Sequence, residues 1–367
     1  MPEAMIRLDA VTKRFPGTDA PAVDRLSLEV PEGELAVLVG PSGCGKTTTL
    51  KMINRIVEPT EGHIEVDGRD IMAIDPHRLR LDIGYVIQQV GLFPHKTVAA
   101  NIATVPRLLG WDKGRIRDRV DELIELMSLD AQMLDRYPPE LSGGQRQRVG
   151  VARALAADPP VLLMDEPYGA VDPLVRGRLQ DQLLDLQRDL HKTIVFVTHD
   201  IDEAIKLGDR IAILNVGGIL EQYDTPEAIL RDPANDFVAS FLGEERGLKR
   251  LSLIPVTQAA LEQGPMVAAS ASVDEAKGVA QDNGDDWVGV LDGQRLRGWL
   301  WVTDLDATRA LGDHETHDFR VWIQDDASLR TAVDAIVNTR GNVAVVYQGS
   351  TYRGLLRIEQ VANELIS

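Results

Sequence analysis

One segment of the sequence has the residue types needed to hold a polyphosphate. It follows an apolar run, 34–39, and leads into a helical run that begins near Thr48. Glycines in such a loop let backbone N–H groups turn toward phosphate oxygens, and the start of a helix adds a favourable dipole. Lys46 supplies a positive charge for the terminal phosphates, and Thr47 offers a hydroxyl to Mg²⁺. We therefore predict that ATP binds the residues Gly40, Pro41, Ser42, Gly43, Cys44, Gly45, Lys46, Thr47 and Thr48.

Two carboxylates stand at the end of another apolar run, 161–164. Ligands of α/β proteins bind at the carboxyl ends of the strands, so we expect Asp165 and Glu166 beside the bound phosphates. Asp165 then completes the Mg²⁺ site with Thr47, while Glu166 orients or deprotonates the attacking water. An acidic pair after a strand is by itself more often a solvated turn, but the accompanying phosphate loop favours the catalytic interpretation.

A second phosphate-binding segment is predicted at residues 141–145, directly before the helical run 146–155. A serine followed by two glycines makes a helix start with free N–H donors and no side-chain bulk. The alternative is an ordinary capped helix start. Because one chain needs only one cradle for the terminal phosphate, we expect this segment to cover the nucleotide of another copy. The residues concerned are Ser142, Gly143, Gly144 and Gln145.

The elements that must position these residues are those of an α/β domain. Short apolar runs at 34–39, 161–164 and 193–197 are typical of buried strands in a largely parallel sheet with crossover helices. Between the first two runs, apolar residues recur every three or four positions, and we expect a helical subdomain over about residues 90–158. The chain of 367 residues is longer than one usual domain, so this domain is expected to span residues 1–245.

Residues 246–367 are expected to form a second, α+β domain. The charged, glycine-flanked residues 243–247 have no periodic pattern and are typical of a linker, which places the start of this domain near Leu248. Within it, residues 266–305 align with 322–361 at a fixed offset of about 56 residues. Each copy has the pattern helix, strand, turn, strand, helix, and we predict two small units that bury their apolar faces against each other.

The composition disfavours several kinds of partner and location. The net charge of −18 argues against nucleic acid, whose phosphates would be repelled. No apolar run approaches the ~20 residues needed to cross a bilayer. The start of the sequence lacks the basic and apolar blocks of a secretory signal, and Cys44 is the only cysteine. We therefore expect a cytosolic, reducing location and no intrachain disulfide.

Across almost all of residues 1–245 the sequence resembles the ATP-binding cassette (ABC) family. The resemblance implies a P-loop NTPase fold and ATP hydrolysis at the interface of a dimer. It also gives roles to four further residues. Phe15 stands where an aromatic side chain stacks on adenine, Gln88 where a glutamine reaches the metal and the attacking water, and Asp172 in the loop that crosses the dimer. His199 corresponds to the histidine that contacts the γ-phosphate.

The resemblance further indicates an importer. Exporters commonly fuse the ATPase to membrane helices, which this sequence lacks, so the integral-membrane permease is expected to be a separate partner. Residues 91–98, just after Gln88, resemble the surface on which importer ATPases receive the coupling helices of their permeases. The chain is thus expected as a peripheral subunit on the cytoplasmic face of the membrane. There it would pair with a second ATPase chain, as a homodimer, and be served indirectly by a substrate-binding protein.

Residues 50–62 and 198–213 are similar to those of the osmoprotectant branch of importers, which takes up glycine betaine, proline betaine, choline or carnitine. Sugar and polyamine importers usually have Ala-Gly where Asn54 and Arg55 stand. Two alternatives remain open. One is an importer of another cationic solute such as a polyamine, and the other is a soluble ABC ATPase outside transport.

The repeat in the second domain resembles a pair of CBS modules, which act as regulators in osmoprotectant importers. In nucleotide-binding modules a glycine is followed by a hydroxyl residue after three positions and by an aspartate after six. The first repeat keeps Gly298 and Asp304 but has Trp301 at the hydroxyl position. The second keeps only its glycine, Gly354. A small-molecule effector and a purely structural or dimerising role are therefore both open.

Overall fold

The computed structural model divides into two compact units, Met1–Gly243 and Glu244–Ser367, and each is described by itself. Of the stretch 243–247 that suggested a linker, the residues from Arg246 onward already belong to helix α11 (Arg246–Leu251). The second unit therefore begins with a helix. The residues that the structure describes are 4–88, 91–169, 171–319, 321–337 and 343–366.

Unit 1 is built around a sheet whose strands are parallel except for one edge strand, β10. Every residue of β3, β7 and β8 is buried, because helices and a second sheet cover both faces. The strands predicted from the apolar runs are confirmed. In spatial order the strands of this sheet are β10 (Ile219–Asp224), β9 (Arg210–Asn215), β3 (Leu35–Val39), β8 (Thr193–Thr198), β7 (Val161–Asp165) and β6 (Ile83–Val86).

A smaller antiparallel sheet lies against the first one. One buried apolar cluster joins the two sheets to helix α1 (Lys46–Ile53) and includes Ile6, Leu38 and Leu50. This cluster anchors both ends of the phosphate loop in the core. The strands of the second sheet are, in spatial order, β2 (Val23–Pro31), β1 (Ala4–Lys13), β4 (Glu61–Val66) and β5 (Arg69–Asp70). They are followed in the chain by η1 (Ile71–Ala73) and α2 (Pro76–Leu81).

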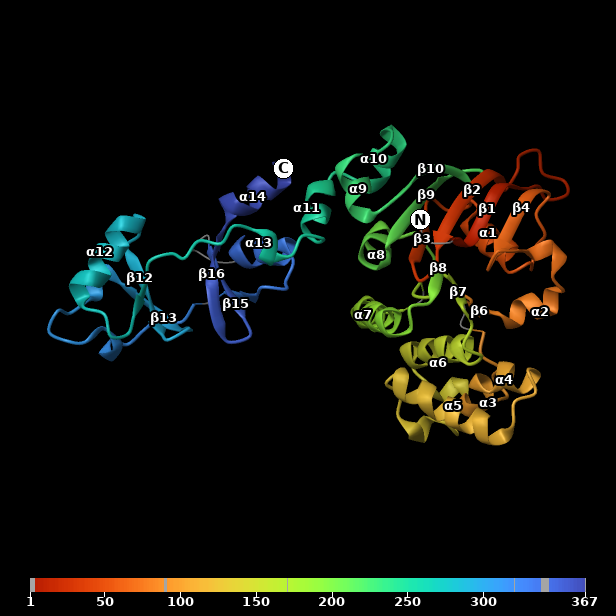
Figure 1. Ribbon diagram of the computed structural model, residues 1–367, viewed down its shortest axis with the longest axis horizontal. Coiled ribbons are helices and arrows are strands. Elements are labelled where there is room, and N and C mark those ends of the chain that lie inside the picture. Colours follow the sequence, from red (N-terminus) through yellow and green to blue (C-terminus); the bar gives the residue numbers. More distant parts are fainter. Residues whose placement is uncertain (1–3, 89–90, 170, 320, 338–342, 367) are drawn as a thin grey trace. The chain divides into compact units, whose positions relative to one another are not determined.

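A group of helices occupies the region between β6 and β7 in the sequence. Figure 1 shows α3, α4 and α5 gathered around α6, apart from β1, β2 and β4. Helix α5 buries Val120, Leu123 and Ile124 on one side, as its amphipathic pattern predicted. The helices and short turns of this group are α3 (Val98–Ile102), α4 (Thr104–Leu108), α5 (Lys113–Leu126), η2 (Ala131–Met133), η3 (Pro138–Glu140) and α6 (Gly143–Leu155).

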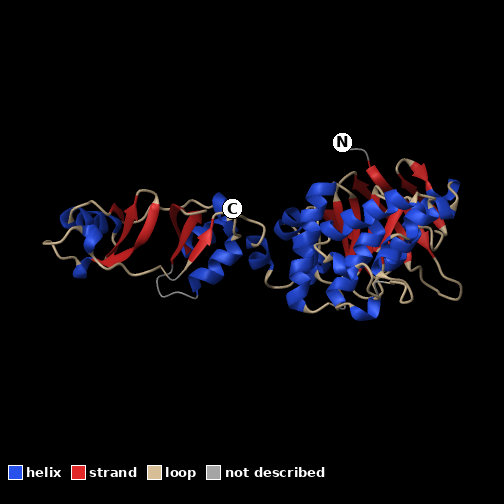
Figure 2. Cartoon of the chain, turned by 90° about the horizontal axis from the view of Figure 1, so that it is seen from below, coloured by secondary structure: helices blue, strands red, loops and turns tan. Residues whose placement is uncertain are grey.

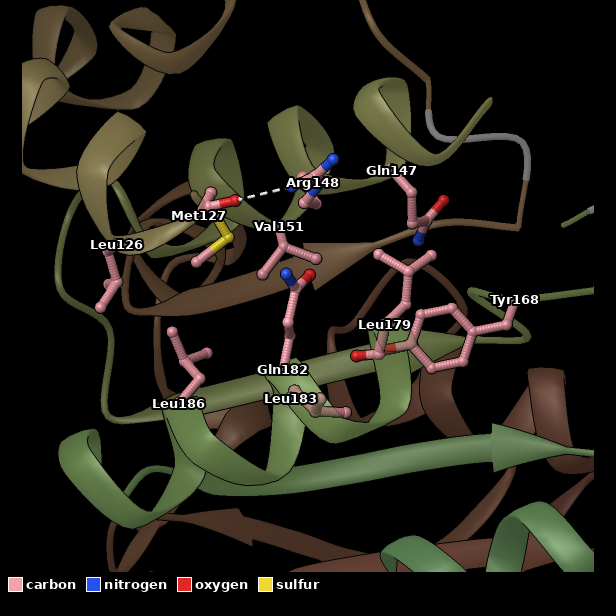
Figure 3. Close-up of a pocket in the computed structure, with 10 residues that line it drawn as sticks. All are labelled: Leu126, Met127, Gln147, Arg148, Val151, Tyr168, Leu179, Gln182, Leu183 and Leu186. Atoms are coloured by element: carbon pink, nitrogen blue, oxygen red, sulfur yellow. Dashed lines mark hydrogen bonds between the residues drawn. The ribbon is translucent and has the colours of Figure 1, made fainter. Parts of the chain in front are cut away.

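Helix α7 connects this helical group to the sheet. Figure 3 shows Val151 of α6 facing Leu179 and Leu183 of α7 across a small, largely apolar cavity. Tyr168, which is buried, donates its hydroxyl hydrogen to the carbonyl oxygen of Leu179 at 3.3 Å. Helix α7 therefore touches both the helical group and the loop after β7. The remaining helices of unit 1 are α7 (Pro173–Leu190), α8 (Ile201–Leu207), α9 (Pro226–Arg231) and α10 (Asp236–Leu242).

Unit 2 contains two copies of one design, displaced by 56 residues in the sequence. Each copy has a parallel pair followed by an antiparallel pair, and the register of the antiparallel pair shifts at the same place, with the extra residue in the last strand. The first copy comprises β11 (Met266–Ala268), α12 (Val273–Asn283), β12 (Trp287–Asp292) and β13 (Arg295–Trp301). The second comprises β14 (Trp322–Gln324), α13 (Leu329–Val337), β15 (Val343–Gln348), β16 (Thr351–Arg357) and α14 (Ile358–Ile366). A short turn, η4 (Val256–Gln258), precedes both.

The closing helix that the repeat pattern predicted is present in the second copy but wrong for the first. There the chain makes only two short turns, η5 (Val302–Asp304) and η6 (Leu311–Asp313). The carboxylate of Asp306 accepts hydrogen bonds from the backbone N–H and the hydroxyl of Thr308. Such local bonds compete with helical ones, which explains why the helix does not continue.

The two copies bury their sheets against each other. Figure 2 shows the two sheets of unit 2 between its helices. Leu296, Val345 and Leu355 form the buried centre of this contact. The segment before each copy also pairs with the other copy, through the bridges Glu262 to Leu355 and Trp299 to His317. Among the described helices of the whole chain, none is both long and apolar enough to cross a bilayer.

Candidate functional site

The Gly40–Thr47 loop joins the carboxyl end of β3 to the start of α1. Its backbone comes so close to neighbouring chain that glycine is required at two positions. A Cβ atom on Gly40 would lie 2.1 Å from the carbonyl oxygen of Leu214, and one on Gly45, whose φ is +100°, would lie 2.6 Å from that of Ala22. Both separations are far below contact distance, so the curl of this loop is fixed by the chain around it.

The ammonium group of Lys46 lies inside this curl. The side chain is only 5% exposed, and Nζ donates hydrogen bonds to the carbonyl oxygens of Gly40 (2.8 Å) and Pro41 (3.0 Å). The buried sulfur of Cys44 lies 3.5 Å from the same nitrogen. The loop therefore holds its one positive charge where the predicted phosphates would lie, and Cys44 packs beneath it. Thr48 follows in the first turn of α1.

Asp165 and Thr47 form the predicted pair at the end of β7. Thr47 donates its hydroxyl hydrogen to Oδ1 of Asp165 at 2.8 Å, and Tyr85 donates to Oδ2 at 3.5 Å. Burial raises the pKa of Asp165, because the ionised carboxylate has lost hydration. Burial and the neighbouring Asp165 also raise the pKa of Tyr85, which keeps the phenol protonated as a donor. A carboxylate and a hydroxyl are ligands that suit a hard cation such as Mg²⁺.

Glu166 is held by two side chains from distant parts of the sequence. Gln88 donates from Nε2 to Oε2 of Glu166 at 3.1 Å, and Nδ1 of His199 lies 3.3 Å from the same oxygen. The backbone of Glu166 has a φ of +43° and donates its N–H to the carbonyl oxygen of Val197. A left-handed conformation is uncommon for a residue with a side chain and is typical of functional sites. The structure thus brings together Glu166 and Gln88, which are predicted to act on the attacking water, and His199, which is predicted to contact the γ-phosphate.

The Leu141–Gln145 segment is a helix start in which Leu141 is buried and Ser142 and Gly143 are exposed. Ser142 accepts a hydrogen bond on Oγ from the N–H of Gln145, and Gln145 accepts one on Oε1 from the N–H of Ser142. This reciprocal capping box is the ordinary interpretation of the motif, and it is compatible with a second role. A Cβ atom on Gly143 would meet nothing within 4 Å. The segment opens α6, which lies among α3–α5 and apart from α1 in Figure 1, so the chain does not bring it to its own phosphate loop.

Two other predicted residues lie outside the Glu166 cluster. Phe15 is 38% exposed in the turn after β1, with the ammonium group of Lys13 5.3 Å from its ring centre. Asp172 is exposed directly before α7, and its carbonyl oxygen accepts the N–H groups of Val175 and Arg176. Ala170 of the same loop lies outside the described residues.

Tyr85 is a site residue that sequence reasoning missed. It lies on β6, directly beside Leu163 of β7, so its hydroxyl reaches the carboxylate at the end of the neighbouring strand. Its position three residues before Gln88 was the only available signal, and a tyrosine in a strand more often packs than binds.

Comparison with known proteins places this arrangement in a family. The family model described as ABC transporter matches residues 23–169. An osmoprotectant import ATP-binding protein of Salmonella typhimurium is 46% identical over 99% of this chain and 97% of its own length. A glycine betaine/carnitine/choline transport ATP-binding protein of Bacillus subtilis is 47% identical over 91% of this chain and 88% of its own length.

A solved structure is similar to more than half of the chain. It is the dimeric, post-hydrolysis state of an ATP-binding cassette bound to ADP and phosphate, with a TM-score of 0.55 and 34% identity. The match covers 60% of this chain and 99% of that one. The phosphate loop, the carboxylate pair and the capped glycine segment fall within the residues 23–169 matched by the family model. The chain therefore belongs to the ABC transporter family, among its ATP-binding proteins.

Proposed function

We propose that the chain is the ATP-hydrolysing subunit of an importer for osmoprotectants such as glycine betaine, choline, carnitine or proline betaine. The observation that carries the ATPase part is the cluster at the end of β7. Thr47 and Asp165 are bonded to each other there, and the next residue, Glu166, is held by Gln88 and His199. A metal site and a positioned base thus stand side by side, next to the phosphate loop.

Thr47, Asp165 and Gln88 are the residues that would hold Mg²⁺. The fit rests on the donor set, since the Thr47 hydroxyl lies 2.8 Å from Oδ1 of Asp165 and hydroxyl, carboxylate and amide oxygens are ligands that suit a hard cation. When bound, the metal neutralises negative charge on the terminal phosphates.

In the proposed reaction Glu166 accepts a proton from the water that attacks the γ-phosphorus atom. The bond from that phosphorus to the bridging oxygen breaks, and ADP and phosphate leave. Gln88 and His199 keep the Glu166 carboxylate in place, while Lys46 stabilises charge on the phosphates. Phe15 provides an aromatic surface for the adenine at the open side of the loop.

The working unit in this proposal is a homodimer. Each ATP lies between the Gly40–Thr47 loop of one copy and the Ser142–Gln145 helix start of the other, with Asp172 in the loop that crosses between them. Three observations support this arrangement. The helix start is exposed, it lies apart from its own phosphate loop, and a similar solved cassette is dimeric.

The proposed membrane partner is a separate permease, which places the chain on the cytoplasmic face of the membrane. A candidate contact surface lies shortly after Gln88. Phe93 is 38% exposed there, with the ammonium group of Lys96 4.4 Å from its ring centre and the guanidinium carbon of Arg153 at 5.8 Å. Such a surface combines apolar area with charge, as protein interfaces do. The names of the two similar transport proteins support the osmoprotectant substrates and the importer direction, in which a substrate-binding protein would deliver the solute.

Unit 2 is proposed to be a tandem CBS regulator. Its two equal copies with buried, facing sheets support this assignment. Trp301 stands at the position where nucleotide-binding modules have a hydroxyl residue, and it is 39% exposed. The proposed partner of this unit is a small-molecule effector.

Replacing Glu166 by Gln tests the ATPase assignment. Because Gln cannot accept the proton, we expect hydrolysis to fall by roughly 100-fold or more while ATP still binds and traps a dimer. Phosphate release and size-exclusion chromatography with ATP would measure both effects. Normal hydrolysis by the variant would exclude the role given to Glu166.

Reconstitution with the permease and the binding protein tests the solute. Glycine betaine or choline is expected to stimulate ATP hydrolysis in proteoliposomes. Stimulation by a polyamine instead would favour the alternative importer, and hydrolysis that no permease or solute changes would favour an ATPase outside transport.

A further inference from the structure

Arg176 lies one turn into helix α7, directly after the loop that contains Val171 and Asp172. Its guanidinium group makes contacts in two directions. Nη2 donates a hydrogen bond to the carbonyl oxygen of Val171 at 3.4 Å, and Nη1 lies 3.7 Å from Oδ2 of Asp200. The side chain is 27% exposed, so both contacts are partly shielded from water. One side chain thus joins the loop before α7 to the residue that follows His199.

The two carboxylate oxygens of Asp200 have different partners. Its Oδ1 atom caps helix α8 by accepting the N–H groups of Asp202 (2.9 Å) and Glu203 (3.3 Å). Its own N–H donates to the hydroxyl oxygen of Thr198 at 3.0 Å. The other carboxylate oxygen, Oδ2, is the one that faces Arg176. The position of His199, between Thr198 and Asp200, is therefore tied to the position of Arg176.

A second pair lies one turn further along the same helices. Gln180 donates from Nε2 to Oε1 of Glu203 at 2.9 Å, and both side chains are more than nine-tenths buried. Gln180 is four residues after Arg176 on α7, and Glu203 is three residues after Asp200 on α8. Residues at these spacings share one helix face, so the two pairs hold the starts of α7 and α8 together as one body.

The same residues line a small cavity beside the proposed base. Its walls include Glu166, Gly169, Arg176 and His199. A displacement of the loop at Val171 would therefore reach His199 through Arg176 without passing through the sheet.

We propose that Arg176 is a positioning residue that transmits the placement of the Val171–Asp172 loop to His199 and thereby sets the contact between His199 and Glu166. Arg176 does not touch the reacting atoms. The inference rests on the proposed ATPase activity, in which this loop crosses to the second copy. Closure of the dimer would then adjust His199 within the same chain.

Two single variants weaken the contact between Arg176 and Asp200 while leaving the cap of helix α8 in place. Arg176→Gln removes the charge that faces Asp200, whereas Asp200→Asn keeps an oxygen for the α8 cap, since Asn caps helices about as well as Asp. Because a misplacement of about 1 Å can cost a large part of a catalytic rate, we expect each variant to lower kcat roughly 10-fold. The KM for ATP should change by less than about twofold, because the phosphate loop is untouched.

The decisive measurement is a double-mutant cycle on the full chain, with phosphate release as the readout. The variant carrying both substitutions should be no slower than either single one, because each breaks the same contact. Arg188→Gln, on the same helix and pairing only with exposed Asp185 among the contacts described, is the matched control and should leave kcat unchanged.

Three outcomes would overturn the inference. They are a wild-type kcat in Arg176→Gln, losses that multiply in the double variant, or a fall in kcat that only follows a lower melting temperature in both single variants. Absence of hydrolysis by the unaltered chain would instead contradict the proposed function.

Discussion

The two helix starts proposed to hold phosphate differ in what makes their glycines necessary. At Gly40 and Gly45 of the first loop the surrounding backbone leaves no room for a side chain, and Lys46 is buried inside the curl. In the Leu141–Gln145 segment Gly143 is exposed, with open space where a Cβ would lie. The first loop is thus completed within one chain. In the second, a Cβ on Gly144 would lie 3.1 Å from Val175, but nothing in the same chain explains Gly143, which points to a surface that something else must approach closely.

The largest effect on ATP hydrolysis is expected when a side chain is placed in the open space at Gly143. Gly143→Leu should lower ATP hydrolysis by roughly 100-fold or more, the order of the loss when a donor to a reacting oxygen is removed, because the side chain would enter the other copy's site. The melting temperature should stay the same or rise, since Leu is a better helix former than Gly by nearly 1 kcal/mol. Phosphate release and thermal unfolding would measure the two effects.

A matched control is available in unit 2. Gly278 also lies in a helix with nothing within 4 Å of its Cβ position. Gly278→Leu should therefore leave hydrolysis unchanged. Full activity of the Gly143→Leu variant would remove the main support for a shared site.

A substitution at Gly40 is expected to lower the stability of the fold, unlike the substitution at Gly143. Gly40→Ala forces a Cβ to within 2.1 Å of the carbonyl oxygen of Leu214, so the loop or β9 must move. We expect a loss of about 2 kcal/mol in the free energy of unfolding, typical of strain at a special backbone position, together with weaker ATP binding. Chemical denaturation and ATP titration would measure both. A variant that kept its stability would mean that the first loop is as adaptable as the second.

The strands and helix starts that carry the site residues could be predicted from the sequence because each is a local pattern. The strands before Gly40 and Asp165 were visible as apolar runs, since strands covered on both faces need no polar residues. Tyr85 was missed because its partner, Asp165, lies 80 residues away and is adjacent only through the pairing of β6 and β7. Arg176 was missed for the same reason, since its contact with Asp200 exists only once α7 and α8 are packed.

The error in unit 2 has a different cause. The repeat correctly predicted corresponding strands, because equal sequence patterns bury equal faces. It predicted a closing helix in the first copy, where the Asp306 carboxylate instead binds Thr308. A single polar residue can redirect the chain at the end of an element, where no buried face holds the helix in place.

The smallest effect is expected for the negative charge of Asp165, the carboxylate that lies beside the Gly40–Thr47 loop and has no counterpart at the Leu141–Gln145 segment among the contacts described. Burial raises the pKa of Asp165, so the folded chain holds this proton more tightly than the unfolded chain does. The free energy of unfolding therefore falls as the pH rises above the ordinary aspartate pKa of 3.8 and through the raised pKa of Asp165.

Without nucleotide and metal, Asp165→Asn should have a slightly higher melting temperature than the unaltered chain at pH 7, and the difference should shrink as the pH falls. Added ATP and Mg²⁺ should reverse the order, because only the carboxylate gains from the cation. Asp121→Asn, at an exposed position on α5, should show neither trend. An Asp165→Asn variant that is less stable at every pH would mean that its hydrogen bonds outweigh the burial of its charge.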